Sequence, residues 1–279
     1  MEELMVYFNE MPDYSKLIWI FFCMSFMLII ESIIPLFKGG FRSRQHFSTN
    51  LIFLATVVAC NLIIGVFTVG LYDWLDTNNW GLLNLVEGAV WVELLASFLI
   101  LDLVSQYFAH WSVHNVKPLW RLHLVHHSDT HVDATTGLRL HPLDYLVRES
   151  FAILAVFLLD APFAYYLMYR FGTIACSHFN HANIRLPLAV DKAMSWVFIS
   201  PNMHKFHHHY EVPWTDTNYG QMFSIWDRLF GTYYYGDVDQ IKYGLDVTDM
   251  SKANDVKYQA MLPFTNNGRE KFNIESQKQ

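Results

Sequence analysis

Charged residues are scarce in this chain of 279 residues. They make up 16% of the sequence, where a typical soluble domain has about 25%, and hydrophobic residues make up 53%. A shortage of charge on this scale indicates a protein that uses a lipid bilayer as solvent. The charges that are present sum to −7. Because nucleic-acid binding normally requires a basic surface, this balance argues against a nucleic-acid partner.

Cysteine is also rare, with three residues in the chain. Cys23, Cys60 and Cys176 each lie within an apolar stretch. Thiols in such surroundings behave as small buried hydrophobic groups, so the sequence predicts neither disulfides nor thiolate metal ligands. The absence of cysteine from the polar motifs disfavours structural zinc sites rich in thiolate and iron–sulfur clusters.

Long apolar runs, in contrast, are prominent. Three of them, at 17–36, 49–72 and 90–109, have about the 20 residues that cross a bilayer core. A further apolar stretch at 143–180 is broken by Asp160-Ala161-Pro162, and proline suits the first turn of a new helix. We therefore expect an all-α integral membrane protein with about three full transmembrane helices and a helical hairpin, whose arms cover about 143–159 and 162–180.

The loops between the runs differ in the sign of their charge. Segment 37–48 carries basic residues and no acid, whereas the loop after the second run carries acids and no base. The positive-inside rule places segment 37–48 in the cytoplasm and the N-terminus outside. The third run then ends in the cytoplasm at His110, and the hairpin returns His178 and His181 to the same side.

Histidine is the polar residue in excess, with 14 in the chain, and all except His46 lie between 110 and 209. The segment HWSVH at 110–114 contains an HX3H pair, and residues i and i+4 share one helix face. HX2HH occurs at 123–127 and again at 204–208, and HX2H at 178–181. Adjacent histidines in HX2HH diverge by about 100° on a helix, so one such segment can reach two metals. The candidate metal ligands are His110, His114, His123, His126, His127, His178, His181, His204, His207 and His208.

Ten imidazoles suit two metal ions with four or five ligands each, and they exceed the four ligands of one tetrahedral zinc. The second ring nitrogen of a ligand usually needs a partner of its own. Asp102 lies within the third run, where an acid is costly and usually functional. We take Asp102, Asp216 and Asn218 as candidate catalytic residues. Candidate partners for the second nitrogens are Asp129, Asp133, Asp216, Asn218 and Asp227.

The remaining histidines have simpler interpretations. His141 precedes Pro142 at the start of an apolar run and is expected to cap a helix or to support a ligand. His46 stands alone in the basic loop and is expected to be solvated. His131 lies close to the second motif, and His209 extends the third motif to three consecutive histidines, which leaves the register of His207, His208 and His209 open.

The order HX3H, HX2HH, HX2HH after membrane spans resembles the fatty acid hydroxylase / sterol desaturase superfamily. The resemblance extends from about 102 to 234 and includes HHSDTHVDATTGLRLHP (126–142), FNHANIRLP (179–187), SPNMHKFHH (200–208) and TNYGQMFSIWDRLFGTY (217–233). Trp111 departs from it, because family members commonly have arginine after the first histidine.

The resemblance implies a helical, histidine-rich di-metal domain that caps the membrane helices on their cytoplasmic face. It also implies two iron ions, dioxygen as co-substrate, and an external electron donor of cytochrome or ferredoxin type. The implied substrate is a lipid (fatty acyl, sterol or ether lipid), which is hydroxylated or desaturated, and the ten histidines above are the implied ligands. Zinc can replace iron in purified protein, since imidazole sites accept both. The bacterial character of the matching segments favours a bacterial inner membrane over the endoplasmic reticulum.

The expected organisation has three parts: a transmembrane region at 1–109, a catalytic region at 110–235 that includes the hairpin 143–180, and a polar C-terminal tail at 236–279.

Two other functions make different demands on the sequence. A histidine-rich metal transporter or sensor needs ionisable residues that form a path along the spans, and only Glu31, Glu93 and Asp102 lie there. A zinc-dependent membrane hydrolase needs an open metal position and a carboxylate base, and the sequence contains no HEXXH.

Overall fold

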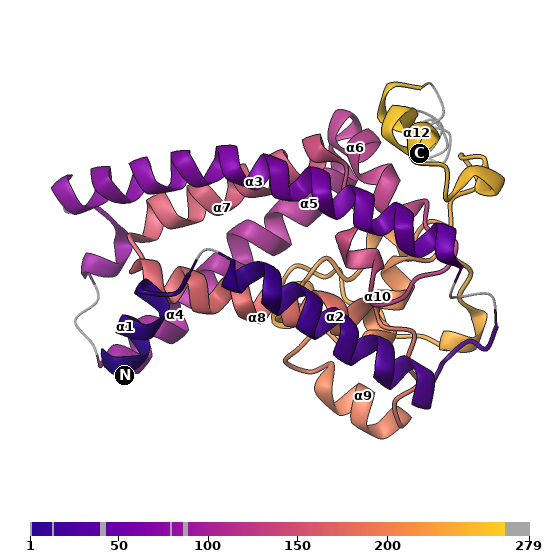
Figure 1. Ribbon diagram of the computed structural model, residues 1–279. Coiled ribbons are helices and arrows are strands. Elements are labelled where there is room, and N and C mark those ends of the chain that lie inside the picture. Colours follow the sequence, from indigo (N-terminus) through magenta and orange to yellow (C-terminus); the bar gives the residue numbers. More distant parts are fainter. Residues whose placement is uncertain (1, 13, 40–42, 79, 86–88, 266–279) are drawn as a thin grey trace.

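The computed structural model describes residues 2–12, 14–39, 43–78, 80–85 and 89–265. Long helices lie along one axis, and short helices gather into a cap at one end of them (Figure 1). The N-terminal helix α1 lies at the opposite end. The elements of the long part are α1 (Glu2–Asn9), α2 (Ser15–Ile33), α3 (Arg44–Asn78), η1 (Leu82–Leu85), α4 (Val90–Asp102), α7 (Pro142–Leu159) and α8 (Phe163–His181).

The cap is built from short helices and the loops that join them. In the described part of the chain the β-structure is limited to two isolated bridges, Pro35 with Ile184 and Phe198 with Phe223. The elements of the cap and its approach are η2 (Leu103–Phe108), α5 (Ala109–Asn115), α6 (Lys117–His127), η3 (Thr136–Leu138), α9 (Leu188–Met194), α10 (Pro201–His207), η4 (Trp214–Asp216), α11 (Ile225–Leu229), η5 (Val238–Gln240), η6 (Met250–Lys252), α12 (Val256–Met261) and η7 (Leu262–Phe264).

Among the residues that the structure describes, three helical stretches are long and apolar enough to cross a membrane: Ser15–Ile33, Arg44–Leu85 and Val90–Asn115. Large apolar side chains on these helices are exposed, as at Ile63 and Phe67, which fits contact with lipid. Over the described residues, the prediction of a helical chain with three candidate membrane helices is confirmed. The fourth apolar stretch forms α7 and α8, and the chain turns between them at Asp160, where φ is 57°.

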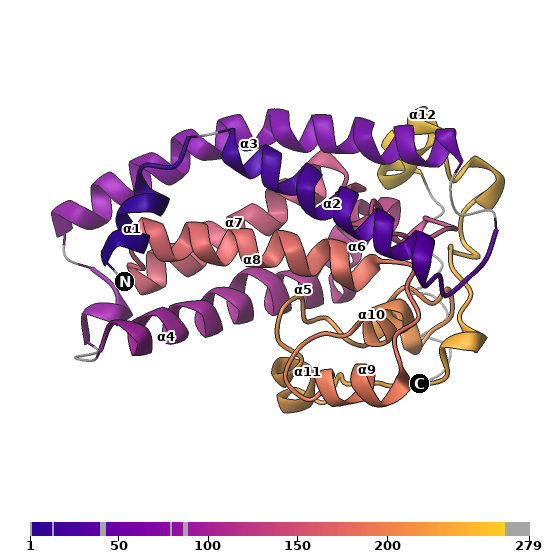
Figure 2. The same cartoon turned by 60° about the horizontal axis from the view of Figure 1, so that its bottom comes forward.

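The long helices form two pairs, since α3 packs on α7 and α2 packs on α8. The continuous helix formed by α4 and η2 packs against α7, and α4 also packs against α8. Figure 2 shows α3 and α2 on one side of this arrangement and α4 on the other. The hairpin arms α7 and α8 therefore diverge after their shared turn and face different partners.

Helix α3 begins earlier than the apolar run that predicted it, because its first turns belong to the cap. His46, Thr49 and Asn50 are buried there. His46 Nε2 lies 2.9 Å from a carboxylate oxygen of Asp129, and Nδ1 lies 3.6 Å from Asp133. The expectation that His46 is solvated was wrong, because both carboxylates come from a segment more than 80 residues away.

Helix α4 continues through η2, a short π-helix, into α5. A π turn changes the direction in which the next side chains point, and such turns occur frequently at functional sites. Asp102 lies where η2 begins and is fully buried. Its carboxylate accepts hydrogen bonds from the Tyr169 hydroxyl (3.0 Å), the Trp226 indole (3.0 Å) and the Phe223 amide (3.2 Å). Asp102 thus joins the approach to the cap to α8 and α11.

The segment from 236 to 265 packs onto the cap. Leu245 and Leu262 are buried against Trp120 and Leu124 of α6. Arg139 is also fully buried, and it donates hydrogen bonds to the Val125 carbonyl (2.9 Å) and to the Ala253 carbonyl. These contacts fix the position of α6 from two sides.

Gly81 provides a test of the packing at the end of the bundle away from the cap. Its φ is 137°, and a Cβ atom there would lie 2.2 Å from Asp160 Cβ and 2.6 Å from the Leu159 carbonyl oxygen. We expect Gly81→Ala to lower the free energy of unfolding by about 1–3 kcal/mol because of backbone strain. Gly65→Ala is the matched control, since a Cβ at this helical position meets open space. Thermal unfolding in detergent measures both, and equal melting temperatures for the two variants would contradict the expectation.

Candidate metal centre

Nine buried histidines form two adjacent groups. Within each group, one ring nitrogen of every histidine lies within 4.8 Å of those of the others. Neither group includes a cysteine or a carboxylate among the described residues. The first group is His110, His114, His123, His127 and His207, and the second is His126, His181, His204 and His208.

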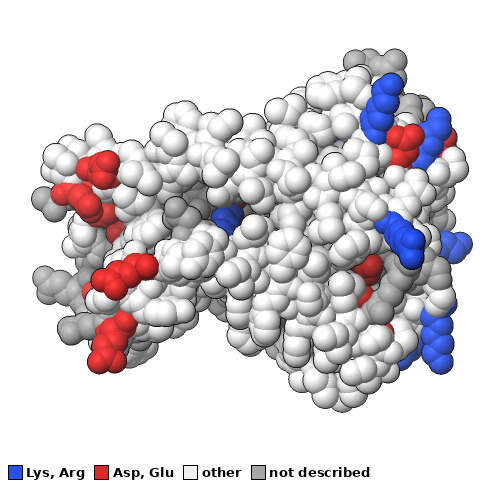
Figure 3. All heavy atoms as spheres, in the orientation of Figure 1, with Lys and Arg blue, Asp and Glu red and all other residues white. Residues whose placement is uncertain are grey.

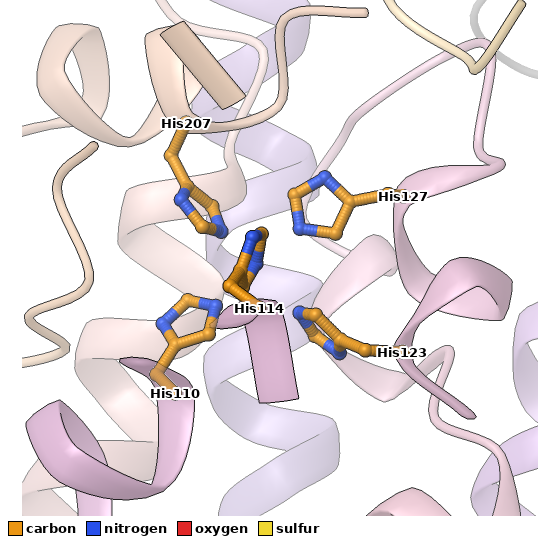
Figure 4. A group of neighbouring side chains, drawn as sticks. All are labelled: His110, His114, His123, His127 and His207. Atoms are coloured by element: carbon orange, nitrogen blue, oxygen red, sulfur yellow. The ribbon is translucent and has the colours of Figure 1, made fainter. Parts of the chain in front are cut away.

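The first group draws on three helices. His110 and His114 come from α5, His123 and His127 from α6, and His207 from the end of α10. Figure 4 shows the five rings around a common space. The ring centres of His110 and His207 are 4.3 Å apart, and those of His114 and His127 are 4.7 Å apart. The i, i+4 spacing in α5 and α6 therefore places two imidazoles from each helix on one side.

The second group uses α6, α8 and α10. His181 Nε2 lies 3.2 Å from His126 Nε2 and 2.9 Å from His204 Nε2. His208 stacks on His127 of the first group, with ring centres 4.6 Å apart, so the two groups adjoin. Helix α6 contributes to both groups because His126 and His127 point in different directions, as the helical period predicts.

Hydrogen bonds to the outer ring nitrogens orient several of these imidazoles. His110 Nδ1 donates to the Tyr219 carbonyl and His207 Nδ1 to the Thr217 carbonyl, both at 2.8 Å. A carbonyl oxygen only accepts, so Nδ1 carries the proton and Nε2 keeps its lone pair for the interior of the group. His181 Nδ1 donates to its own helix, at the Ser177 carbonyl (2.7 Å).

Two carboxylates hold rings of the first group in the same way. His123 Nδ1 lies 2.9 Å from Asp144, and His114 Nδ1 lies 3.1 Å from Asp216. Asp144 is fully buried and also lies 3.4 Å from the Arg148 guanidinium, one turn along α7. A carboxylate behind an imidazole raises its basicity as a ligand.

The inner nitrogens fit a metal ion. His110 Nε2, His207 Nε2 and both ring nitrogens of His127 and His208 are buried without a hydrogen-bond partner. Buried polar atoms in proteins are nearly always paired, so such a cluster requires an occupant. Burial lowers the pKa of His127 and His208 well below the usual value, and the neighbouring imidazoles lower it further. The rings are therefore neutral near pH 7 and able to bind metal.

One of the ten predicted ligands lies outside both groups. His178 Nδ1 donates to the Ala134 carbonyl at 2.6 Å, and the ring lines a cavity between the helices.

Asn218 adopts a left-handed conformation (φ 54°), and its side-chain amide donates hydrogen bonds to the Met203 and Tyr234 carbonyls at 2.9 and 2.8 Å. Asn218 therefore connects the loop behind His207 to α10.

The predicted partners of the second nitrogens divide into two sets. Asp216 lies behind a ring of the first group, whereas Asp129 and Asp133 face His46 instead. Asp227 accepts from the Tyr219 amide (2.7 Å) and the Gly220 amide (3.0 Å), and so holds the loop whose carbonyl bonds His110.

Sequence reasoning missed Asp144 and the carbonyls of Thr217 and Tyr219. An acid in the first turn of a helix is common because it complements the helix dipole, so Asp144 carried no distinctive signal. Backbone acceptors cannot be predicted from residue identity, because every residue has a carbonyl oxygen.

The expectation that His141 caps a helix is confirmed, since its Nδ1 accepts a hydrogen bond from the Leu143 amide at 3.2 Å.

Substitution of Asp144 tests the role of the outer partners. We expect Asp144→Asn to weaken metal binding at the first group by about 10–100-fold, because a neutral amide holds the His123 ring less firmly. Competition with a chelator measures the affinity. Asp246→Asn, at an exposed position of the cap, is the control and is expected to leave affinity unchanged. Equal affinities for the two variants would show that Asp144 does not support the ligand.

Similarity to known proteins is concentrated in the region that builds this centre. Residues 94–232 match the model of the family described as "Fatty acid hydroxylase", which is about half of the chain. The match begins in α4 and ends just after α11, so it includes all nine clustered histidines. No solved structure matches the chain significantly.

Curated relatives come from bacteria and animals. An ornithine lipid hydroxylase of Rhizobium tropici is 30% identical over 128 residues, which cover 46% of this chain and 38% of that protein. Alkylglycerol monooxygenases of Xenopus tropicalis and Homo sapiens are each 28% identical over 243 residues, covering 85% of this chain and 51% of theirs. The matches thus span about half the length of these relatives or less. Together with the family match over the histidine-bearing region, they show that the chain belongs to the fatty acid hydroxylase family.

Proposed function

We propose that this chain is a membrane-bound non-haem di-iron oxygenase that hydroxylates or desaturates a lipid with dioxygen and electrons from an external donor. The observation that carries the proposal is the pair of adjacent imidazole groups, in which His110 and His207 are each held through Nδ1 while Nε2 is buried without a hydrogen-bond partner. The relatives support a lipid substrate, since their names state hydroxylation of an ornithine lipid and monooxygenation of an alkylglycerol. Both names favour hydroxylation over desaturation.

The residues of the chain have defined parts in this mechanism. Iron, when bound, supplies the reduction of dioxygen and the oxidation of a C–H bond, which side chains alone cannot perform. Asp144, Asp216 and the carbonyl of Tyr219 keep the imidazoles in the orientation that binds metal. Asp102 acts as a positioning residue, because its three donors fix η2 relative to α8 and α11. Burial of both groups excludes bulk water from the centre.

The proposed organisation keeps a transmembrane region at 1–109, a catalytic region at 110–235 and a C-terminal segment at 236–279. We place the cap in the cytoplasm of a bacterium and the N-terminus outside the inner membrane. Acidic side chains gather at the end of the molecule that carries α1, and basic side chains gather mainly on the cap (Figure 3). The positive-inside rule favours this orientation, with the centre supplied by a cytoplasmic electron donor.

Alanine variants test the function and the two groups together. The full chain is purified in detergent, loaded anaerobically with ferrous iron and given a reductant and lipids. We expect the wild type to bind two irons, to consume dioxygen only with reductant, and to yield a hydroxylated lipid by mass spectrometry. His207→Ala and His126→Ala should each lose one iron and all turnover, because each removes a ligand from a different group. His131 lies outside both groups, so His131→Ala should retain two irons and full turnover. Full turnover in His126→Ala would overturn the proposal.

The orientation is tested with single cysteines and a membrane-impermeant maleimide on intact bacterial inner-membrane spheroplasts. Asp76→Cys lies near the end of α3 away from the cap, and Lys38→Cys lies near the cap; both positions are exposed. We expect label at 76 in intact spheroplasts and at 38 only after lysis. The reverse pattern would place the cap outside the cell.

A further inference from the structure

A large cavity lies between the two pairs of long helices. Its volume is about 950 Å³, and its lining is mostly apolar. Residues of α2, α3, α7 and α8 form its walls, because the α3–α7 pair and the α2–α8 pair diverge. Figure 3 shows a hollow on the face where α2 and α3 lie in Figure 1, so the cavity opens toward the lipid.

One end of the cavity reaches the metal centre. Gly137, Ser177 and His178 line this end, and the Ser177 carbonyl accepts the hydrogen bond that orients His181. A Cβ atom at Gly137 would lie 2.4 Å from Ser177 Oγ and 3.4 Å from His181 Nδ1. The cavity therefore ends against the backbone that carries a ring of the second group.

A polar cluster interrupts the apolar wall farther along. Lys16 Nζ donates to Asn61 Oδ1 at 3.2 Å, and the Tyr145 hydroxyl donates to the same oxygen at 2.7 Å. Beside them, Arg170 Nη2 pairs with Glu149 Oε1 at 2.7 Å. All five side chains line the cavity.

The cluster has an unbalanced charge. Glu149 offsets Arg170, and Lys16 adds a positive charge whose hydrogen-bond acceptor, Asn61, is neutral. Among the described residues that line the cavity, one net positive charge therefore remains.

Lys16 lies in the first turn of α2, and the other members of the cluster lie well inside α3, α7 and α8. Helix α3 continues from Asn61 to Asn78, which corresponds to about 25 Å at 1.5 Å per residue. In Figure 3 a basic side chain is visible inside the hollow, away from both charged ends of the molecule. Ionisable groups at such positions are costly in a bilayer and usually serve a ligand or a transport path.

We propose that the cavity binds a lipid with an anionic group, a phosphate or a carboxylate, which pairs with Lys16 beside Asn61 and Arg170. The inference rests on the proposed function and names the substrate class of the same site. The apolar chain of the lipid extends from this anchor toward His178. Arg170 and Ser177 are seven residues apart in α8, so the anchor lies about 10 Å from the end of the cavity at the metal centre. The anionic group thereby selects which carbon of the chain approaches the metals.

Binding of two probes to the purified full chain in a neutral detergent tests this proposal without turnover. Hexadecyl phosphate carries the anionic group, and hexadecanol has the same chain without charge. We expect isothermal titration calorimetry to show that hexadecyl phosphate binds at least about tenfold more tightly, because a buried charge pair in low dielectric is strong. Palmitate as a third probe distinguishes carboxylate from phosphate preference. Equal affinities for hexadecanol and both anions would overturn the proposal.

Two variants locate the effect in the cavity. Asn61→Asp retains an acceptor for Lys16 and Tyr145 at nearly the same volume and cancels the positive charge. We expect it to weaken hexadecyl phosphate binding about tenfold and to leave hexadecanol binding unchanged. Lys16→Met should do the same, whereas Lys38→Met, on the exposed loop near the cap, should not. Wild-type affinity for hexadecyl phosphate in both cavity variants, with metal content intact, would refute the anchor.

The outcome is separable from that of the oxygenase assay. A chain that discriminates between the probes but never consumes dioxygen would refute the oxygenase and leave the anchor in place. An active oxygenase that binds both probes equally would refute the anchor alone.

Discussion

The burial of nine imidazoles in two adjacent groups is the constraint on which this structure depends. Each ring has two nitrogens, and in a low-dielectric interior both require a partner. Five of the rings have an acceptor on the outer side, at Asp144, Asp216 or a backbone carbonyl, and buried nitrogens without a hydrogen-bond partner, such as His110 Nε2 and His207 Nε2, remain for metal. Most of these acceptors come from loops and helix ends that are far apart in the sequence. The packing of the cap holds them in place around the imidazoles.

The surrounding polar network follows from this requirement. The Tyr219 carbonyl can orient His110 only if its loop is fixed, and Asp227 fixes it through two backbone amides. Asp102 links the π-helix before His110 to α8 and α11. The long helices leave a mostly apolar cavity that ends beside the Ser177 carbonyl, which orients His181. In the proposed function, a lipid chain reaches the centre through this cavity.

Much of this was readable from the sequence, and the failures share one cause. Apolar runs predicted the long helices, and histidine spacing predicted nine residues that the structure brings together, since both patterns are local to a helix. His46, Asp144 and the displaced His178 could not be foreseen, because each is defined by a contact between distant segments. The backbone carbonyls behind His110 and His207 have no counterpart in residue type. The polar cluster around Lys16 unites four helices and was equally hidden.

The most direct test of two adjacent metal sites is Mössbauer spectroscopy of the wild-type chain loaded anaerobically with iron-57 and then oxidised, together with its iron content. The account predicts two iron signals and two irons per chain, because the chain offers two separate groups of buried imidazoles that adjoin at His127 and His208. One iron per chain would contradict it.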